Sequence, residues 1–216
     1  MTIGIKSYVK RLGKFTDAQR KAYDELAEKY IIPYSENLLE MPENLTLEIG
    51  FGSGLATAEI AEANTEKNYL GIEVHRPGIG RLLWEIEKRS LKNIKIIEYD
   101  AAFAVKKMIP TGSLDAIHIF FPDPWPKTRH RKRRLVQRPF TETLAGCLKE
   151  GGYLYMVTDW EDYALHALEE LTASSSLKNK YESFASAQSW RPRTRFEEKG
   201  IAKNHVIREL LFVKKS

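Results

Sequence analysis

Cysteine is almost absent from this sequence: Cys147 is the only one among 216 residues. A lone thiol excludes an internal disulfide, and no group of cysteines and histidines has the spacing of a zinc site. We therefore predict that the protein holds no metal and works in a reducing compartment, the cytoplasm. Cys147 falls in LAGCLKEGG, an expected helix, where it is expected to be a small buried apolar residue.

Long apolar runs are absent too. No segment reaches the roughly 18 consecutive apolar residues of a membrane-spanning helix, and the N-terminal MTIGIKSYVKRLGKF has no apolar stretch of the signal-peptide type. We expect no membrane partner. The 43% hydrophobic and 29% charged residues are ordinary for a globular chain of this length. The sequence predicts a single domain over 1–216, in which 1–16 form a basic N-terminal arm.

A strong net charge is also lacking, because 34 Lys and Arg stand against 29 Asp and Glu, which leaves only +5. The positive charge is nevertheless concentrated, since residues 127–134 carry six Lys or Arg and no acid. Such clustering is typical of nucleic-acid-binding proteins, in which contacts to phosphates supply much of the affinity. A solvated charged loop is the alternative, and charge alone leaves both interpretations open.

Short apolar runs alternate with amphipathic stretches along the chain. Strands are expected at 45–49, 69–74, 94–99, 114–121 and 153–157, and helices at 17–30, 55–63, 79–91, 101–108, 135–148 and 160–172. This alternation predicts a doubly wound α/β fold with a mainly parallel sheet. Two further strands, at 181–185 and 205–213, are expected to add an antiparallel C-terminal pair, which makes the sheet seven-stranded.

In such a sheet, ligands bind beyond the carboxyl ends of the strands. The first strand ends in EIGFGSG, which contains Glu48 and three closely spaced glycines, Gly50, Gly52 and Gly54. The glycines permit a tight turn and the close approach of a ligand. A dinucleotide fingerprint would need a glycine where Leu55 stands, and the turn has no P-loop lysine. Because Glu48 would repel a pyrophosphate and attract a cation, S-adenosylmethionine fits better than NAD.

The next two strands end in acids as well. Glu73 lies about 20 residues beyond the glycines, where a carboxylate can accept hydrogen bonds from ribose hydroxyls. Asp100, followed by Ala101, could receive the exocyclic amine of an adenine. Each acid alone could be an ordinary surface residue. Together, after three successive strands, they predict a nucleoside pocket.

The fourth and fifth strands end in acid–aromatic pairs. Pro122, Pro124 and Pro126 restrict the backbone around Asp123 and Trp125 and should hold both side chains in one orientation. After the fifth strand, Asp159 precedes Trp160, and Asp159 either contacts a substrate or caps the following helix. His118 lies inside a strand and is expected to be structural.

The segments EIGFGSG, GIEVHRPGIG, YDA, IFFPDPWPKTRHRKRR, TDW and RPRTRFE, in this order, resemble the bacterial tRNA (guanine-N7-)-methyltransferases. The resemblance covers nearly the whole chain, and FPDPWPK with its basic tail is its most specific motif. It implies a class I Rossmann-like enzyme. Such an enzyme would transfer a methyl group from S-adenosyl-L-methionine to N7 of a guanine in the tRNA variable loop and release S-adenosyl-L-homocysteine.

The resemblance also implies roles for individual residues. Asp123 falls at the catalytic position. Donor-binding positions are occupied by Glu48, Glu73, Asp100 and Asp123. Substrate-contacting positions are occupied by Lys127, Asp159, Thr194, Arg195, Phe196 and Glu197. The RNA-contacting stretch is Arg129, His130, Arg131, Lys132, Arg133 and Arg134. The expected partner is tRNA, bound by a monomer or homodimer without an obligate protein partner. The roles of Lys203, Asn204 and His205 stay open.

The chemistry suggests how Asp123 would act. Guanine N7 carries a lone pair and no proton, so no general base is strictly required. Positive charge moves onto the purine ring during transfer, and a fixed carboxylate would stabilise it. Asp123 could also accept hydrogen bonds from guanine N1–H or the N2 amine, while Trp125, Trp160 or Phe196 stacks on the base.

Three other functions compete with this one. An adenine-N6 methyltransferase would use an Asp/Asn-Pro-Pro-aromatic turn, whereas the order here is Pro-Asp-Pro-Trp. A nicotinamide-dependent oxidoreductase is disfavoured by Leu55 and Glu48. A non-catalytic nucleic-acid-binding module is disfavoured because four acids around one pocket mouth suit a phosphate-binding surface poorly.

Overall fold

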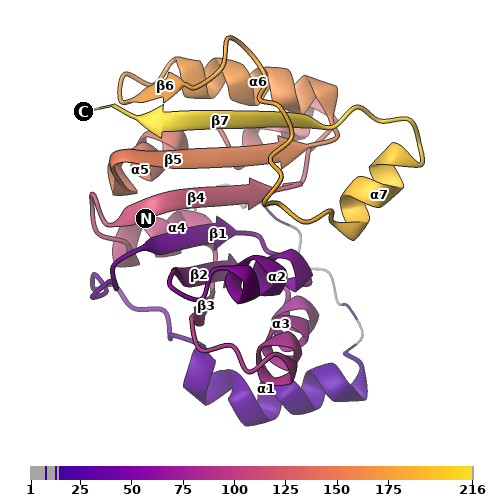
Figure 1. The fold of residues 1–216 in the computed structure, drawn as a ribbon. Coiled ribbons are helices and arrows are strands. Elements are labelled where there is room, and N and C mark those ends of the chain that lie inside the picture. Colours follow the sequence, from indigo (N-terminus) through magenta and orange to yellow (C-terminus); the bar gives the residue numbers. More distant parts are fainter. Residues whose placement is uncertain (1–7, 9–12, 14, 216) are drawn as a thin grey trace.

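The computed structural model describes residues 8, 13 and 15–215, so most of the predicted basic arm lies outside the described residues. The described chain forms one seven-stranded sheet with helices on both faces (Figure 1). This architecture confirms the predicted doubly wound α/β fold.

The strands are β1 (Leu45–Ile49), β2 (Asn68–Glu73), β3 (Ile94–Glu98), β4 (Leu114–Phe120), β5 (Leu148–Thr158), β6 (Leu177–Asn179) and β7 (Arg208–Lys214). Their order across the sheet is β3-β2-β1-β4-β5-β7-β6. The first five are parallel, and β7 runs antiparallel between β5 and β6. The predicted C-terminal antiparallel pair is therefore present at the edge of the sheet.

The predicted strand at 181–185 is wrong. The edge strand is Leu177–Asn179, and beyond it only Ala185 makes an isolated bridge, to Glu209. The Asn179 side chain explains the early end, because it accepts a hydrogen bond from the Tyr181 amide at 3.1 Å and donates one to the Ser183 carbonyl at 2.8 Å. These local bonds turn the backbone away from the ladder.

The helices are α1 (Asp17–Tyr30), α2 (Leu55–Ala63), α3 (Arg76–Lys88), α4 (Ala101–Met108), α5 (Phe140–Cys147), α6 (Glu161–Thr172) and α7 (Arg195–Ile201), with a 3-10 helix η1 (Thr128–Arg133). Three of the predicted ranges match α1, α2 and α4. The helix expected at 135–148 begins only at Phe140, because the preceding Pro139 lacks an amide donor and restricts the backbone. Neither α7 nor η1 was predicted.

Two apolar cores lie on the two faces of the sheet. Ile117 and Ile119 of β4 face the core under α4, α5 and α6, whereas Phe120 faces the core that includes α1, α2 and α3. This alternation follows from the two-residue period of a strand. Cys147 is buried in the first core, as predicted, and burial raises the pKa of its thiol to about 11.

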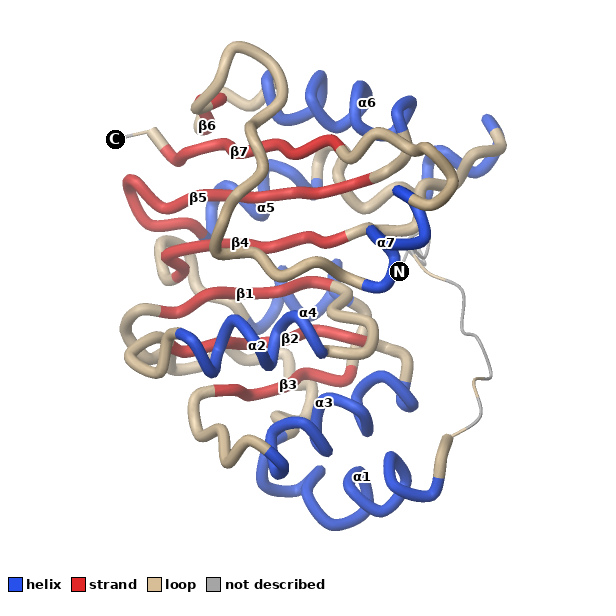
Figure 2. The backbone as a smooth tube through the Cα atoms, turned by 45° about the vertical axis from the view of Figure 1, so that its right-hand side comes forward, coloured by secondary structure: helices blue, strands red, loops and turns tan. Residues whose placement is uncertain are grey.

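On the face of the sheet that also carries α1, α2 and α3, a long segment rather than a helix covers β4 and β5. This segment, residues 180–194, crosses the strands on its way to α7 (Figure 2). The Trp190 ring stacks on His118 with 5.0 Å between centroids, and His118 Nε2 lies 3.1 Å from the Tyr153 hydroxyl. Burial lowers the pKa of His118 to about 3, so the ring is neutral and structural, as predicted. None of the helices in the described chain is long and apolar enough to cross a membrane.

Candidate active site

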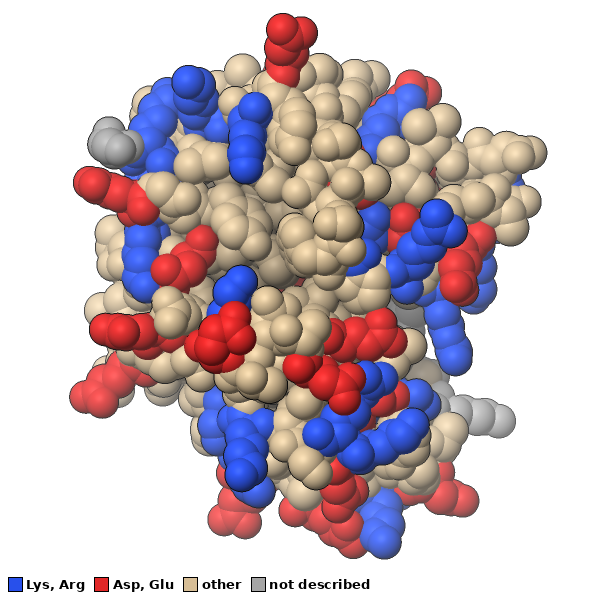
Figure 3. Space-filling model, in the orientation of Figure 1, with Lys and Arg blue, Asp and Glu red and all other residues tan. Residues whose placement is uncertain are grey.

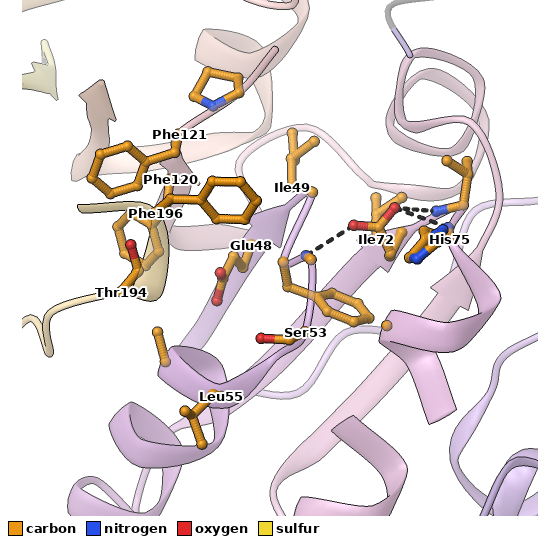
Figure 4. Close-up of a pocket in the computed structure, with 18 of the residues that line it drawn as sticks. Glu48, Ile49, Ser53, Leu55, Ile72, His75, Phe120, Phe121, Thr194 and Phe196 are labelled. Carbon is orange, nitrogen blue, oxygen red and sulfur yellow. Dashed lines mark hydrogen bonds between the residues drawn. The ribbon is translucent and has the colours of Figure 1, made fainter. Parts of the chain in front are cut away.

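A cavity of about 530 Å³ lies at the carboxyl ends of β1, β2 and β4. Its volume suits a small-molecule ligand. Four parts of the chain meet there: the glycine turn after β1, the start of α3, the proline-rich turn after β4, and the segment 193–199. Figure 4 shows Glu48 in the middle of these parts, with Phe121, Thr194 and Phe196 on one side and Ile72 and His75 on the other.

Glycine is required both in the turn after β1 and in the part of α3 that packs against it. Gly50, Gly52 and Gly54 have φ values of 75°, 58° and 67°, in the left-handed region that favours glycine. Gly78, in the first turn of α3, packs so closely that a Cβ atom there would lie 1.9 Å from the Gly52 carbonyl oxygen. Gly50 and Gly52 line the cavity, whereas Gly54 sits behind it at the start of α2.

Glu73 holds this turn against the start of α3. Its carboxylate accepts hydrogen bonds from the amides of Gly52 at 2.9 Å, Val74 at 2.7 Å and His75 at 3.0 Å (Figure 4). A carboxylate has about four lone-pair sites. Glu73 therefore has a structural role that the sequence did not reveal. A ribose could use only the lone pairs that the three amides leave free, and the predicted ribose contact stays a prediction.

Glu48 is the most unusual acid of the cavity. Only 3% of the residue is exposed, although it lines the cavity. Burial raises the pKa of its carboxyl group to about 7, and the charge of Glu73 acts in the same direction. A cationic group bound beside Glu48 would stabilise the ionised form and offset the cost of burial.

Asp100 lies at the edge of the cavity rather than in its lining, where its neighbours Tyr99 and Ala101 are found. Its side chain caps α4 by accepting a hydrogen bond from the Ala102 amide at 2.9 Å. The predicted contact between Asp100 and an adenine amine stays a prediction.

The proline-rich turn presents Asp123 to the cavity. Asp123 is exposed and lines the cavity, whereas Trp125 is only 9% exposed. The Arg133 guanidinium covers the Trp125 ring at 4.4 Å, and the His130 ring meets it edge-on. Trp125 therefore lies within the fold and offers little surface for base stacking. Phe196, which is 64% exposed and lines the cavity, is the aromatic residue best placed for that task.

The basic run is split by the structure. Lys127, Arg129, Arg131 and Lys132 are exposed on or beside η1, and His130 and Arg133 are half-buried. Arg134 is buried, and its guanidinium bonds to Asp162 and to the Pro124 carbonyl. The RNA contact predicted for Arg134 stays a prediction, and its guanidinium donors already bind groups of the protein.

The segment before α7 is anchored by a buried ionic network. Arg191 pairs with Glu197 at 2.5 Å and with Glu209 at 2.8 Å, and its Nε lies 3.2 Å from the Tyr155 hydroxyl. Glu197 is also part of a capping box with Thr194 at the start of α7. The capping box was readable as T-x-x-E in the sequence. No pattern in the sequence indicates that Arg191 is buried.

Beyond this network, three cations on or beside α7 face the cavity. Arg193, Arg195 and Lys199 line the cavity together with Phe196. Figure 3 shows Lys and Arg side chains projecting in the region where Figure 1 places α7. Arg193 and Lys199 were not predicted as site residues, because only the folded segment brings them to the cavity.

Asp159 does not cap α6. Trp160 occupies the cap position, and the Asp159 Oδ2 atom lies 3.0 Å from His205 Nδ1. Neither Asp159 nor Lys127 lines the cavity, so their predicted substrate contacts stay predictions. Within the part of the chain that the structure describes, no group of three or more His, Cys, Asp or Glu side chains could hold a metal ion.

Comparison with known proteins decides the family. A family model described as "Putative methyltransferase" matches residues 42–210. The tRNA (guanine-N(7)-)-methyltransferase of Nitrosomonas eutropha is 49% identical, over 97% of this chain and 96% of its own. The enzyme of the same name from Nitrosospira multiformis is 44% identical, over 98% of this chain and 95% of its own. The chain belongs to the tRNA (guanine-N(7)-)-methyltransferase family.

Solved structures of other methyltransferases share the fold. The 16S rRNA methyltransferase KamB is 14% identical with a TM-score of 0.58, over 96% of this chain and 97% of its own. The tRNA (m1A58) methyltransferase of Aquifex aeolicus is 16% identical with a TM-score of 0.51, over 96% and 72%. Membership in the tRNA (guanine-N(7)-)-methyltransferase family confirms the resemblance seen in the sequence. It leaves the oxidoreductase and the non-catalytic module without support.

Proposed function

We propose that this protein transfers a methyl group from S-adenosyl-L-methionine to N7 of a guanine in the tRNA variable loop. One observation carries the proposal: a single cavity joins a buried, cation-attracting Glu48 to an exposed Asp123. The names of the similar proteins support guanine N7 in tRNA as the target.

The residues of the cavity fit the methyl donor. Glu48 would face its positively charged groups, and the glycine turn leaves room for a close approach of the amino-acid part. Glu73 and Asp100, at the ends of β2 and β3, would hold the nucleoside. When bound, S-adenosylmethionine supplies an electrophilic methyl group on sulfur.

Asp123 would act on the guanine. A base has to leave its stack to enter the cavity, and Phe196 offers an exposed ring on which it can stack. The Asp123 carboxylate would hold the base edge and stabilise the positive charge that develops on the purine. Alignment of N7 with the methyl group supplies much of the remaining acceleration.

The cations around the cavity would hold the tRNA backbone. Lys127, Arg129, Arg131 and Lys132 are exposed near the turn that carries Asp123, and Arg193 and Arg195 line the cavity. Phosphate contacts of this kind fix the position of the RNA, whereas contacts in the cavity select the base. The protein would work in the cytoplasm as a monomer or homodimer.

The test is a methyl-transfer assay. The purified chain is incubated with radiolabelled S-adenosylmethionine and unmodified tRNA transcript, with DNA in parallel, and the digested nucleosides are separated. Label in N7-methylguanosine from tRNA is the expected result. Label in a methyladenosine or in DNA would keep the donor and discard the target. Absence of transfer, with tRNA still bound, would overturn the proposed activity.

A further inference from the structure

Arg134, the last cation of the basic run, is built into the protein interior. Its side chain is 1% exposed, against 45% for Arg131. Its Nε donates to the Pro124 carbonyl at 3.0 Å, another guanidinium nitrogen bonds to the Asp162 carboxylate, and the remaining one lies 3.4 Å from the Asp162 carbonyl. The guanidinium also lies 4.9 Å from the Tyr163 ring centroid. All three nitrogens are engaged within the protein, which leaves them poorly placed to bind a phosphate.

The carbonyl that Arg134 binds belongs to a strained turn. Phe121 and Trp125, at the two ends of the turn, have φ values of 49° and 46°. Non-glycine residues persist in this left-handed region only where their surroundings fix them. Pro124, whose carbonyl accepts the bond from Arg134, directly follows Asp123. Arg134 therefore restrains the backbone next to the residue that faces the base.

Asp162 links this restraint to the exposed part of the basic run. It lies in the first turn of α6 and pairs with Arg131 of η1 at 2.9 Å while it also bonds to Arg134. The hydrogen bond from Arg134 lowers the pKa of the Asp162 carboxyl group, which keeps this acid ionised. One carboxylate thus connects α6, the turn and η1.

We propose that Arg134 is a positioning residue that, together with Asp162, locks the turn presenting Asp123 and ties it to the RNA-binding helix η1. The inference rests on the proposed function. RNA held by η1 then has a fixed relation to the base placed at Asp123, and Arg134 acts through geometry rather than by touching RNA.

Kinetics of variants separate this role from phosphate binding. Wild-type formation of N7-methylguanosine is established first. Arg134→Lys keeps the charge but cannot make the same set of bonds, and kcat should fall about 10- to 100-fold. The KM for tRNA should change less than about threefold. In Arg134→Met the salt dependence of tRNA binding should be unchanged, whereas Arg129→Gln should mainly raise KM and lower the salt slope by about one.

A spectroscopic measurement tests the lock without any activity. The emission of Trp125 is isolated by subtracting the spectrum of the same protein carrying Trp125→Phe. Arg134→Lys should shift this emission to the red and increase its quenching by acrylamide, because the turn loosens around the buried ring. If the wild type does not methylate tRNA, the proposed function fails, and this measurement still tests the lock.

Asp162→Asn is a second variant that tests the same lock if Arg134→Lys does not fold. The Asp162 side chain is 43% exposed and belongs to neither apolar core, so its replacement removes no core contact, and it should reproduce the loss of kcat and the Trp125 signal. Wild-type kcat and Trp125 emission in both Arg134→Lys and Asp162→Asn would overturn the proposal. A salt slope lowered by about one in Arg134→Met would also overturn it, since Arg134 would then be a phosphate contact.

Discussion

At the scale of single residues, Asp123 and Glu48 share a cavity but have different environments. Asp123 is exposed at the rim, and Glu48 is buried in the interior. An exposed carboxylate can meet a large incoming base, whereas a buried one binds a small cation strongly because few waters compete. Replacing Asp123 should therefore change mainly kcat, and replacing Glu48 should change mainly the affinity for the donor.

The first prediction concerns Asp123. Asp123→Asn keeps the shape of the side chain but removes its charge, so the developing charge on the purine loses stabilisation. We expect kcat to fall at least about 100-fold, while the Kd of S-adenosylhomocysteine changes less than about threefold. Single-turnover kinetics and calorimetry measure the two quantities. Wild-type kcat in this variant would refute the electrostatic role.

The second prediction concerns the pH dependence of donor-site binding. Burial holds the pKa of Glu48 near 7, so its carboxylate becomes protonated as the pH falls through 7. The affinity for S-adenosylhomocysteine, which carries an ammonium group, should weaken about tenfold from pH 8 to pH 6. The profile should be flat in Glu48→Gln and unchanged in the exposed control Glu43→Gln. A flat wild-type profile would contradict the assignment.

The same shift has a consequence for stability. The pKa of Glu48 is raised on folding from 4.5 to about 7, so its unfavourable contribution is absent below pH 4.5 and complete above pH 7. Glu48→Gln should stabilise the ligand-free protein at pH 8, by up to roughly 3 kcal/mol. At pH 4.5 the gain should vanish. Urea unfolding at the two pH values measures it.

At the scale of elements, the segment 188–201 depends on the Arg191 network rather than on apolar packing alone. Arg191→Met would leave the buried acids Glu197 and Glu209 without their cation. We expect a loss of about 3–5 kcal/mol in the free energy of unfolding. Arg208→Met is the matched control, because its partner Glu161 is 66% exposed, and it should cost less than about 1 kcal/mol. Equal losses would show that burial does not matter.

The exposed part of η1 yields a prediction about RNA binding. Arg129→Gln combined with Lys132→Gln removes two exposed cations, so fewer counterions are released when tRNA binds. The slope of log K against log salt should fall by about 1.5–2. The control pair Lys21→Gln and Lys92→Gln, also exposed, lies outside η1 and should leave the slope unchanged. An unaffected slope in the Arg129→Gln, Lys132→Gln variant would mean that these two cations stay solvated and do not contact tRNA.

At the scale of the whole molecule, both cores pack on one continuous sheet, which predicts a single cooperative unit. Thermal unfolding followed by circular dichroism and by tryptophan fluorescence should give coincident transitions. S-adenosylhomocysteine at about 100 times its Kd should stabilise the fold by roughly 2.7 kcal/mol and shift both transitions upward by roughly 5–10 °C. Two separate transitions would contradict a single domain.

Much of the fold could be predicted because its signals are local. Apolar periodicity located the five parallel strands, and the capping box at Thr16 and Gln19 begins α1 at the predicted residue. The positions of Glu48, Glu73 and Asp123 at or just beyond the ends of strands placed them at one edge, since the carboxyl ends of parallel strands meet there. The prediction of a strand at 181–185 is wrong because the Asn179 side chain, and not the β-propensity of the segment, decides where the edge strand ends.

The sequence by itself determined the alternation of strands and helices, the glycine turn and the order of the acids, since torsional preferences and periodicity act between near neighbours. Only the tertiary structure decided which cations of the basic run face solvent. Arg133 and Arg134 are adjacent and chemically identical, yet one covers Trp125 and the other lies buried against Asp162 of α6. Burial depends on segments distant along the chain, whose positions no local pattern contains.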